Sequence, residues 1–321
     1  MARSYSSVPY IDADTLNEIL DFPTLADALE KAHRLEPPLL DSALLEHDAG
    51  GETPDGFYVL PAWFPGLAMG AKIISILPQN PSKQEPMPAV HALYPIFDGE
   101  TGKPRAVIDG TAMTYWKTAA DSALGSRCLS REDASRLVMV GAGDLSPWLV
   151  RAHCAVRKNI CKVSIWNRTG AKAEAVAAHL QDFQPNVEAV RDLAAAVSEA
   201  DIICCATSAT EPVIEGNWLK PGAHIDLVGG FTPQMREADD EVISRARLFM
   251  DSEWFSLKTG DLSQPLEEGI IDRGEITDLF QLCRRERPGR QTDDEITLFK
   301  NAGGGHLDLM TAMHILSLWG K

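Results

Sequence analysis

A glycine-containing loop at residues 138–148, VMVGAGDLSPW, has the residue types and spacing that bind a phosphate. Gly141 permits a tight turn after an apolar run, and Gly143 lets backbone amides approach a pyrophosphate at the start of the following helix. Ser146 stands where the fingerprint G-x-G-x-x-G has its third glycine, a position that needs only a small residue. Its hydroxyl can cap the helix, with Pro147 at the first helical position. The loop predicts a dinucleotide site, and a phosphate-free turn is the alternative.

The segment WNRT, residues 166–169, bears on the type of dinucleotide. An NAD-binding domain usually places Asp or Glu at the end of its second strand, where the carboxylate binds the ribose 2′-hydroxyl. This chain has Asn167, Arg168 and Thr169 instead. A carboxylate would repel a 2′-phosphate, whereas Arg168 can pair with it. We therefore expect NADPH in preference to NADH, with an ordinary surface role for Arg168 as the alternative.

Both segments need a parallel sheet that brings them to the same edge. From about residue 135, apolar runs of strand length alternate with helical patterns. This alternation predicts right-handed βαβ units and a parallel sheet covered on both faces, as in a Rossmann-like domain. The strands are expected within residues 135–143, 162–169, 187–200, 201–208, 224–230 and 246–252, and the helices within 146–157, 170–183 and 187–200.

The chain before residue 125 has a different pattern. Residues 12–35 predict two short helices around Phe22-Pro23, and the apolar runs that follow are broken by Gly, Pro and Asp. FDGETGKP, residues 97–104, is a strong hairpin signal, so this part predicts a smaller α+β domain with a largely antiparallel sheet. The last segment, 305–321, predicts an apolar helix that packs back on this domain. The expected fold is thus α/β, with 1–125 and 306–321 in one domain and a Rossmann-like domain at 126–305.

Composition excludes several classes of protein. The 321 residues are 45% hydrophobic and 24% charged, which is an ordinary globular balance. The formal charge of −16 argues against binding to nucleic acid or an anionic membrane. No apolar run approaches the ~18 residues of a membrane span, and the first residues lack an apolar signal region, so we expect a cytoplasmic protein. The six cysteines form no C-x-x-C pair and the eight histidines are scattered, so no metal is expected.

Five segments stand in order along nearly the whole chain after the first ~35 residues. They are GAKIISILPQNP (70–81), MTYWKTAADSALGS (113–126), VMVGAGDLSPWLVRAH (138–153), GAHIDLVGGFTPQMRE (222–237) and EITLFKNAGGGHLDL (295–309). Through these segments the sequence resembles the ornithine cyclodeaminase/mu-crystallin family. The resemblance implies a homodimer in which the first domain provides the dimer interface and the substrate pocket. It also implies that the Rossmann-like domain binds a nicotinamide cofactor, which exchanges hydride with an imine beside a carboxylate.

The resemblance also assigns residues to a substrate site. Lys72 matches the family's active-site lysine, which contacts the substrate carboxylate. Lys117 and Thr118 match an Arg-Thr step that touches substrate and cofactor phosphate, and lysine here offers a point charge instead of a bidentate fork. The arginine expected near the N-terminal Pro-Pro is missing, because residues 37–42 read PPLLDS. Carboxylate binding is therefore expected to depend on the two lysines, helped by backbone amides or hydroxyl groups.

One departure from the family pattern distinguishes deamination from imine reduction. Cyclodeaminases of the family resemble GGD where this chain has Phe231 after Gly-Gly, and that aspartate manages the amine and water. Phenylalanine cannot accept a proton, but it can form an apolar wall for a ring or the nicotinamide. The chain is therefore expected to resemble the reductase branch, which reduces Δ1-pyrroline-2-carboxylate and Δ1-piperideine-2-carboxylate to L-proline and L-pipecolate. The open alternatives are ornithine cyclodeaminase, an open-chain imino acid reductase similar to alanine dehydrogenase, and a non-enzymatic crystallin-like NADPH-binding protein.

Two further assignments complete the expected site. Asp226, near the end of a predicted core strand, either stabilises the iminium of the substrate or is a structural carboxylate, and the sequence favours neither. Polar residues at another strand end can line the nicotinamide ribose. The residues expected to contact the cofactor are Thr118, Gly141, Gly143, Asp144, Leu145, Asn167, Arg168, Thr169, Ala206 and Thr207.

Overall fold

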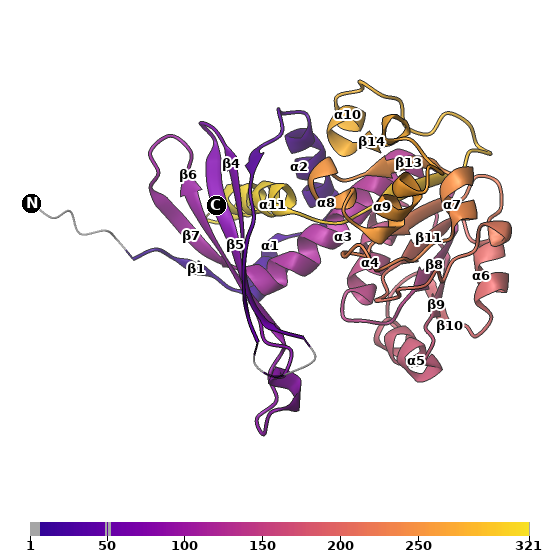
Figure 1. Cartoon of the computed structure of the whole chain (residues 1–321), viewed down its shortest axis with the longest axis horizontal. Coiled ribbons are helices and arrows are strands. Elements are labelled where there is room, and N and C mark those ends of the chain that lie inside the picture. The colour runs from indigo at the N-terminus through magenta and orange to yellow at the C-terminus, as the bar shows by residue number, and fades with distance from the viewer. Residues whose placement is uncertain (1–6, 49, 51–52, 321) are drawn as a thin grey trace, which may run out of the picture. The chain divides into compact units, whose positions relative to one another are not determined.

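The computed structural model describes residues 7–48, 50 and 53–320. The chain forms two compact units, and each is described by itself. The first unit comprises Met1–Ala28, Glu36–Lys117 and Gly304–Lys321, and the second comprises Leu29–Leu35 and Thr118–Gly303. Figure 1 shows an antiparallel sheet with its helices in the first unit and a helix-covered parallel sheet in the second. The α/β fold class, with a Rossmann-like domain and a smaller α+β domain, is confirmed.

The first unit is built on a seven-stranded sheet. Its strands follow the order β1-β7-β6-β5-β4-β2, with β3 also paired to β4, and every pairing is antiparallel except that of β1 with β7. The predicted hairpin connects β6 to β7. The strands are β1 (Tyr10–Ile11), β2 (Leu39–Leu40), β3 (Ala43–His47), β4 (Asp55–Phe64), β5 (Ala68–Ile76), β6 (Val90–Asp98) and β7 (Pro104–Asp109).

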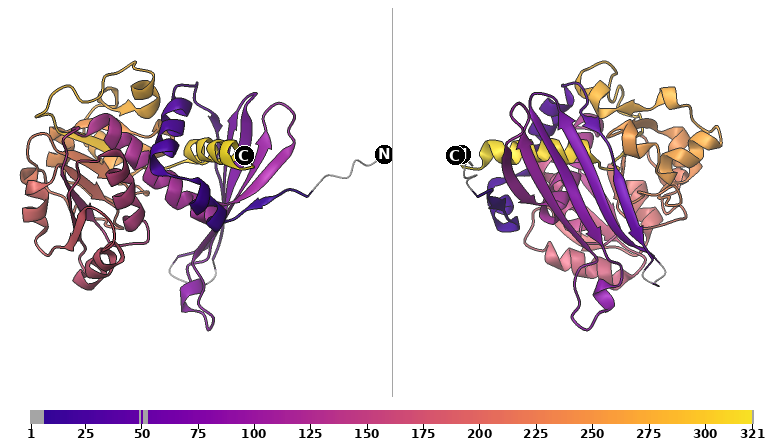
Figure 2. Two further views of the ribbon diagram at one scale, coloured as in Figure 1. Left: turned by 180° about the vertical axis from the view of Figure 1, so that it is seen from behind. Right: turned by 60° about the vertical axis from the view of Figure 1, so that its left-hand side comes forward.

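Helix α11 (Gly305–Leu318) crosses one face of this sheet, over β4, β5 and β6, as the right-hand view of Figure 2 shows. The helix is nearly uniformly apolar because most of its residues are buried. The segment that begins at Gly304 thus groups with the first unit. The other helices that begin in this unit are α1 (Ala13–Ile19), α2 (Phe22–His33) and α3 (Gly110–Leu129), with a 3-10 turn, η1, at Asn80–Ser82.

The second unit contains an eight-stranded, fully parallel sheet in the order β10-β9-β8-β11-β12-β15-β13-β14. The chain runs outward in one direction from β8 to β10 and then continues on the other side from β11. This reversal at β8 and β11 is the topological switch point at which doubly wound sheets bind ligands. The strands are β8 (Arg136–Val140), β9 (Lys162–Trp166), β10 (Asn186–Ala189), β11 (Ile202–Cys205), β12 (His224–Leu227), β13 (Arg247–Met250), β14 (Thr277–Asp278) and β15 (Thr297–Lys300).

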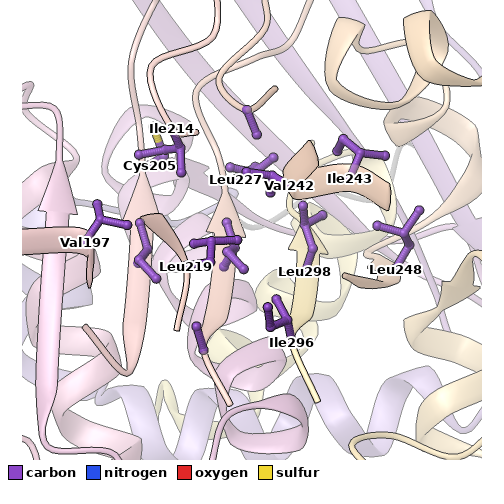
Figure 3. Packing of buried hydrophobic residues seen from close by; sticks show 14 of the residues in the cluster. Val197, Cys205, Ile214, Leu219, Leu227, Val242, Ile243, Leu248, Ile296 and Leu298 are labelled. Atoms are coloured by element: carbon purple, nitrogen blue, oxygen red, sulfur yellow. The ribbon is translucent and has the colours of Figure 1, made fainter. Parts of the chain in front are cut away.

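Helices cover this sheet and bury an apolar cluster against it. In Figure 3, Leu227 and Leu298 project from neighbouring strands toward Val242 and Ile243 on α7. The sheet is buried on both faces, so its strands read as continuous apolar runs. The helices are α4 (Ser146–Val156), α5 (Gly170–His179), α6 (Leu193–Glu199), α7 (Asp240–Arg245), α8 (Glu253–Ser256), α9 (Gly260–Glu267) and α10 (Leu279–Cys283), with 3-10 turns η2 (Gly216–Trp218) and η3 (Arg273–Glu275).

The boundary between the units differs from the sequence-based division at residue 125. It falls at Lys117/Thr118, inside α3, because this helix runs without interruption from one unit into the other. No helix within the described residues is long and apolar enough to span a bilayer.

The glycine at position 70 provides a test of packing in the first unit. A Cβ on Gly70 of β5 would lie 2.6 Å from Cε1 and 2.7 Å from the hydroxyl oxygen of Tyr94, whose side chain is fully buried and cannot move aside. Gly70→Ala should therefore lower the free energy of unfolding by about 1–3 kcal/mol, measured by urea denaturation. Gly274→Ala is the matched control, because its Cβ would meet no described atom within 4 Å. Equal stability of the two variants would contradict this packing.

Candidate active site

The candidate site residues fall into two groups, one in each unit. In the second unit, the loop after β8 forms the glycine turn. Gly141 has φ +109°, and a Cβ there would lie 2.3 Å from the Ala206 carbonyl oxygen, so only glycine fits. Gly143 has no described atom within 4 Å of the position of a Cβ, which leaves its backbone open to a ligand. The turn therefore has the two glycines where a pyrophosphate requires them.

Ser146 has a different role from the predicted cap. It is the first residue of α4, and its buried hydroxyl donates a 3.0 Å hydrogen bond back to the Gly141 carbonyl. The N-cap is Leu145, which makes no side-chain capping bond. The Ser146 hydroxyl thus connects the first residue of α4 to the glycine turn. A third glycine at this position would allow closer packing but could not form this hydrogen bond.

The carboxyl ends of β8, β9, β11 and β12 surround a pocket of about 580 Å³. It contains nine of the residues expected at the cofactor or the substrate: Gly141, Gly143, Asp144, Leu145, Asn167, Arg168, Ala206, Thr207 and Phe231. Ser208, which the sequence placed at the same strand end as Ala206 and Thr207, also lines the pocket. The other lining residues had no role in the sequence-based prediction, namely Ala142, Trp166, Lys172, Ala209, Val213, Val228 and Gly229.

Two of the expected cofactor residues do not line this pocket. Thr169 is the N-cap of α5, and its carbonyl accepts a hydrogen bond from the Asn167 side chain. Thr118 lies on α3 at the boundary between the units, and its carbonyl accepts a hydrogen bond from Asn301. Thr169 therefore fixes the Asn167 side chain through its backbone carbonyl, and Thr118 lies outside the pocket.

Lys172 adds a second cation to the pocket. It lies on α5 four residues after Arg168, and both side chains line the pocket at the end of β9. The available signal in the sequence was the position of Lys172 in the first turn of the helix that follows WNRT. Together they provide two positive charges where a dinucleotide-binding fold holds the adenosine ribose.

Asp226 lies away from the pocket, within the core of the second unit. Its Oδ2 is 3.0 Å from Nε2 of His153 on α4 and accepts a 3.2 Å hydrogen bond from the Cys204 thiol, and all three side chains are fully or nearly fully enclosed. These atoms are close enough to be metal ligands, and the hydrogen bonds among them already occupy them. Of the two roles that the sequence left open, the contacts favour the structural one.

The second group of residues lies in the first unit. Lys72 of β5 and Lys117 of α3 both approach Asp308 of α11, with Nζ–Oδ1 distances of 3.5 and 3.9 Å. Lys72 also donates a 2.5 Å hydrogen bond to the hydroxyl of Thr114. Tyr94 of β6 is buried and experiences the charge of Asp308. We call Lys72, Lys117 and Asp308 the lysine cluster.

Local structure explains how the lysine cluster forms. Along β5 the residues Ala68, Gly70 and Lys72 alternate onto the buried face, so the lysine side chain turns inward. Lys117 lies three residues after Thr114 on α3, so both reach the same helix face. Asp308 was missed from the sequence, although a single acid in the apolar segment GGGHLDLM is a usable signal.

The electrostatics of the lysine cluster are unusual for a protein interior. Two ammonium groups face one carboxylate, which leaves one positive charge in excess among side chains that are at most 6% exposed. Burial lowers the pKa of Lys72 from 10.5 to about 8; Asp308 opposes this effect and Lys117 adds to it. Burial, together with Asp308, raises the pKa of Tyr94 well above its usual value.

The sequence matches the profile of the ornithine cyclodeaminase/mu-crystallin family over residues 50–319. The chain belongs to this family. The resemblance drawn from the five segments is therefore confirmed, and the match covers both the lysine cluster and the dinucleotide pocket.

Relatives within the family carry more specific names. The chain is 38% identical over 317 residues to a Δ1-pyrroline-2-carboxylate reductase of Paracoccus denitrificans, covering 98% of each chain. Among solved structures, it resembles Thermococcus litoralis Δ1-pyrroline-2-carboxylate reductase in complex with NADH and L-proline (TM-score 0.86, 27% identity, 97% of each chain). It also resembles the iminosuccinate reductase of P. denitrificans in complex with NAD⁺ (TM-score 0.85, 25% identity, 97% of this chain and 96% of the other).

Titration of Lys72 provides a test of the lysine cluster that needs no ligand. Because its pKa falls from 10.5 to about 8 on folding, the unfolded chain binds more protons between these values, and stability rises with pH there. The free energy of unfolding of the wild type, minus that of Lys72→Met, should therefore increase between about pH 8 and 10.5, by up to roughly 3 kcal/mol. It should be constant between pH 6 and about 7.5. A difference that stays flat up to pH 10.5 would show that Lys72 is not a buried ammonium.

Proposed function

We propose that this protein reduces Δ1-pyrroline-2-carboxylate to L-proline with NADPH. That it is an NAD(P)H-dependent imine reductase follows from its family and from its named reductase relatives. The identity of the imino acid and the preference for NADPH are the proposal. The carboxylate is assigned to the lysine cluster of the first unit, and the cofactor to the pocket of the second.

The positive charge of the lysine cluster is the observation that carries this proposal. A buried excess cation is costly unless an anion joins it, and an α-imino acid has a carboxylate directly beside the carbon to be reduced. The missing N-terminal arginine leaves Lys72 and Lys117 as the groups that bind it. Because the carboxylate is held, the neighbouring C=N is oriented toward one face.

The side chains that line the dinucleotide pocket support reduction over deamination. Phe231 lines the pocket and is 70% exposed in this structure, so it can form an apolar wall for a ring without moving other groups. It cannot hold a proton or position a nucleophilic amine, which a cyclodeaminase requires. When bound, the nicotinamide cofactor supplies the hydride. The protein's own residues bind the carboxylate, exclude water and orient the imine.

Proton delivery to the imine nitrogen is a separate requirement, because a protonated C=N accepts hydride far better than a neutral one. Lys72 has a pKa of about 8 and lies at the proposed carboxylate site, so it can hold a proton near neutral pH and release it. We assign Asp226 a structural role, since its carboxylate pairs with His153 inside the core.

The preference for NADPH is supported by Arg168 and Lys172. Both line the pocket at the end of β9, where an NAD-specific domain usually carries a carboxylate. The two structural relatives were solved with NADH and with NAD⁺. A nicotinamide nucleotide is thus supported for the fold, and the two cations favour the phosphorylated form for this chain.

We also propose a homodimer, formed through the sheet of the first unit. Its outer face exposes Leu39, Leu45 and Trp63, with 60%, 68% and 44% of their surfaces accessible. A shallow apolar pocket of about 670 Å³ lies in the same region, lined by residues of β2, β4, β5 and β6. Apolar surfaces of this kind mark interfaces between subunits more often than solvent-exposed faces.

A spectrophotometric assay tests the function directly. NADPH oxidation is followed with Δ1-pyrroline-2-carboxylate, Δ1-piperideine-2-carboxylate, pyruvate plus ammonia, and oxaloacetate plus ammonia. We expect the highest kcat/KM with Δ1-pyrroline-2-carboxylate. Higher activity with an open-chain pair would replace the proposed substrate, and ammonia release from ornithine without net NADPH oxidation would replace the reaction.

Removal of the Lys72 ammonium should abolish most turnover. Lys72→Ala should lower kcat/KM for the cyclic imine by roughly 100-fold, since truncating one partner of a buried charge pair costs about 2–5 kcal/mol. The Kd for NADPH should change by less than about twofold, because Lys72 is not among the residues that line the dinucleotide pocket. Lys103→Ala, on the exposed turn before β7, is the control. An unchanged kcat/KM would remove Lys72 from the site.

Arg168→Ala should change cofactor preference. The loss of a charge-assisted bond to the 2′-phosphate costs about 1.5–3 kcal/mol, so KM for NADPH should rise roughly 10- to 100-fold and KM for NADH by less than about twofold. Lys172→Ala should act in the same direction. Arg136→Ala, at the opposite end of the sheet, is the control. Parallel losses for both cofactors would show that the 2′-phosphate is not bound there.

A further inference from the structure

Glu237 connects two loops that form one wall of the dinucleotide pocket. It is fully buried, and its Oε1 accepts hydrogen bonds from the Thr207 amide (2.7 Å) and the Thr207 hydroxyl (2.9 Å). Its Oε2 accepts from the amides of Gly229 (2.7 Å) and Gly230 (3.3 Å). Thr207 follows β11, and the two glycines follow β12, so one carboxylate fixes the ends of two adjacent strands.

The connection is supported from behind by a buried ion pair. Asp261 Oδ1 accepts a 2.7 Å hydrogen bond from the Glu237 amide, and its Oδ2 pairs with Lys300 Nζ at 2.9 Å. Both Asp261 and Lys300 are fully buried. The two loops also pack closely against each other, because a Cβ on Gly229 would lie 2.0 Å from the Thr207 carbonyl oxygen. The second loop packs closely against the ion pair, because a Cβ on Gly230 would lie 2.7 Å from Asp261 Oδ2.

The contacts of Glu237 require a carboxylate. The Thr207 amide and hydroxyl and the Gly229 and Gly230 amides all donate to the carboxylate, so both of its oxygens accept. A glutamine would turn an NH₂ group toward either the Thr207 amide or the two glycine amides, and so leave at least one backbone donor opposed by another donor. Burial raises the pKa of the Glu237 carboxyl, and the positive charge of Lys300 opposes this effect. Lys300 thus helps to keep the acceptor ionised.

The wall lies on a defined side of the sheet. The glycine turn after β8 and the cations after β9 are on one side of the switch point, where the pyrophosphate and adenosine ribose of a dinucleotide bind. Thr207 and Gly229 line the same pocket on the other side, at β11 and β12. A dinucleotide that crosses the switch point therefore places its nicotinamide half against the loops that Glu237 connects.

We propose that Glu237 is a positioning residue that sets the pocket wall for the nicotinamide half of the cofactor. It touches neither the cofactor nor the substrate, and acts through the backbone of Thr207 and of Gly229. The inference rests on the proposed function only for the identity of the dinucleotide.

The test compares two ligands that share the adenosine half. The Kd of NADPH and that of adenosine 2′,5′-bisphosphate are measured by calorimetry, without imino acid, for wild type and Glu237→Gln; NADH and ADP form a second pair. We expect Glu237→Gln to weaken the full dinucleotides at least tenfold and the adenosine fragments by less than twofold. Because no imine is present, the result does not depend on which imine, if any, is reduced.

Asp201→Asn is the matched control. Asp201 makes the same kind of contacts at the opposite end of β11, accepting from the Ser135 and Arg136 amides and the Ser135 hydroxyl and pairing with Lys220. Its substitution should leave the Kd of every ligand within about twofold of the wild-type value, whatever it does to stability. A dinucleotide-selective loss in this control as well would assign the effect to general loosening of the sheet.

Two outcomes for Glu237→Gln itself would overturn the proposal. Unchanged NADPH affinity in Glu237→Gln would show that the wall does not depend on the carboxylate, and equal weakening of dinucleotide and fragment would show that the residue only supports the fold. If Glu237→Gln does not fold, Glu237→Asp keeps the charge but is one methylene too short to reach both loops. It should weaken NADPH at least threefold and spare the fragment, and wild-type affinity for NADPH would refute the inference.

Discussion

The ion pairs of Lys72 and Lys117 with Asp308 constrain the architecture of the first unit. The three residues come from a strand, from a helix that leads into the second unit, and from a helix at the far end of the sequence. Two buried ammonium groups are tolerated only if a carboxylate lies between them, so α11 must return across β4, β5 and β6 to deliver Asp308. The discontinuity of the first unit and the pairing of its buried lysines thus have one physical origin.

In the second unit, the candidate site is formed by exposed backbone groups and not by buried charges. Its parallel strands end at one edge, where glycines at 141, 143 and 229 let main-chain amides and carbonyls approach closely. Side chains that stabilise this edge lie behind it, as with the Ser146 hydroxyl on the Gly141 carbonyl and Glu237 on the amides after β11 and β12. The pocket is open because its supporting hydrogen bonds are made on the buried side.

Much of this arrangement was predictable from local patterns. The alternation after residue 135, the hairpin at 97–104 and the glycine turn are encoded in neighbouring residues, and the dinucleotide pocket contains most of the residues expected in it. What could not be predicted depends on partners distant in sequence. The carboxylate of Asp226 has its role from His153, 73 positions away, and Lys72 and Asp308 meet only when the chain ends have folded together. Strand β14 has only two residues, which is too few to show a periodic pattern. The boundary between the two units could not be read from the sequence, because helix α3 continues through it without a break.

The most direct test of the reductase assignment is the fate of the transferred hydrogen. The protein is supplied with Δ1-pyrroline-2-carboxylate and NADPH carrying deuterium at one or the other face of nicotinamide C4, and the product is examined by mass spectrometry and NMR. We expect L-proline with one deuterium at C2 from only one of the two labelled cofactors. Proline without deuterium from either labelled cofactor, or no proline at all, would contradict this assignment.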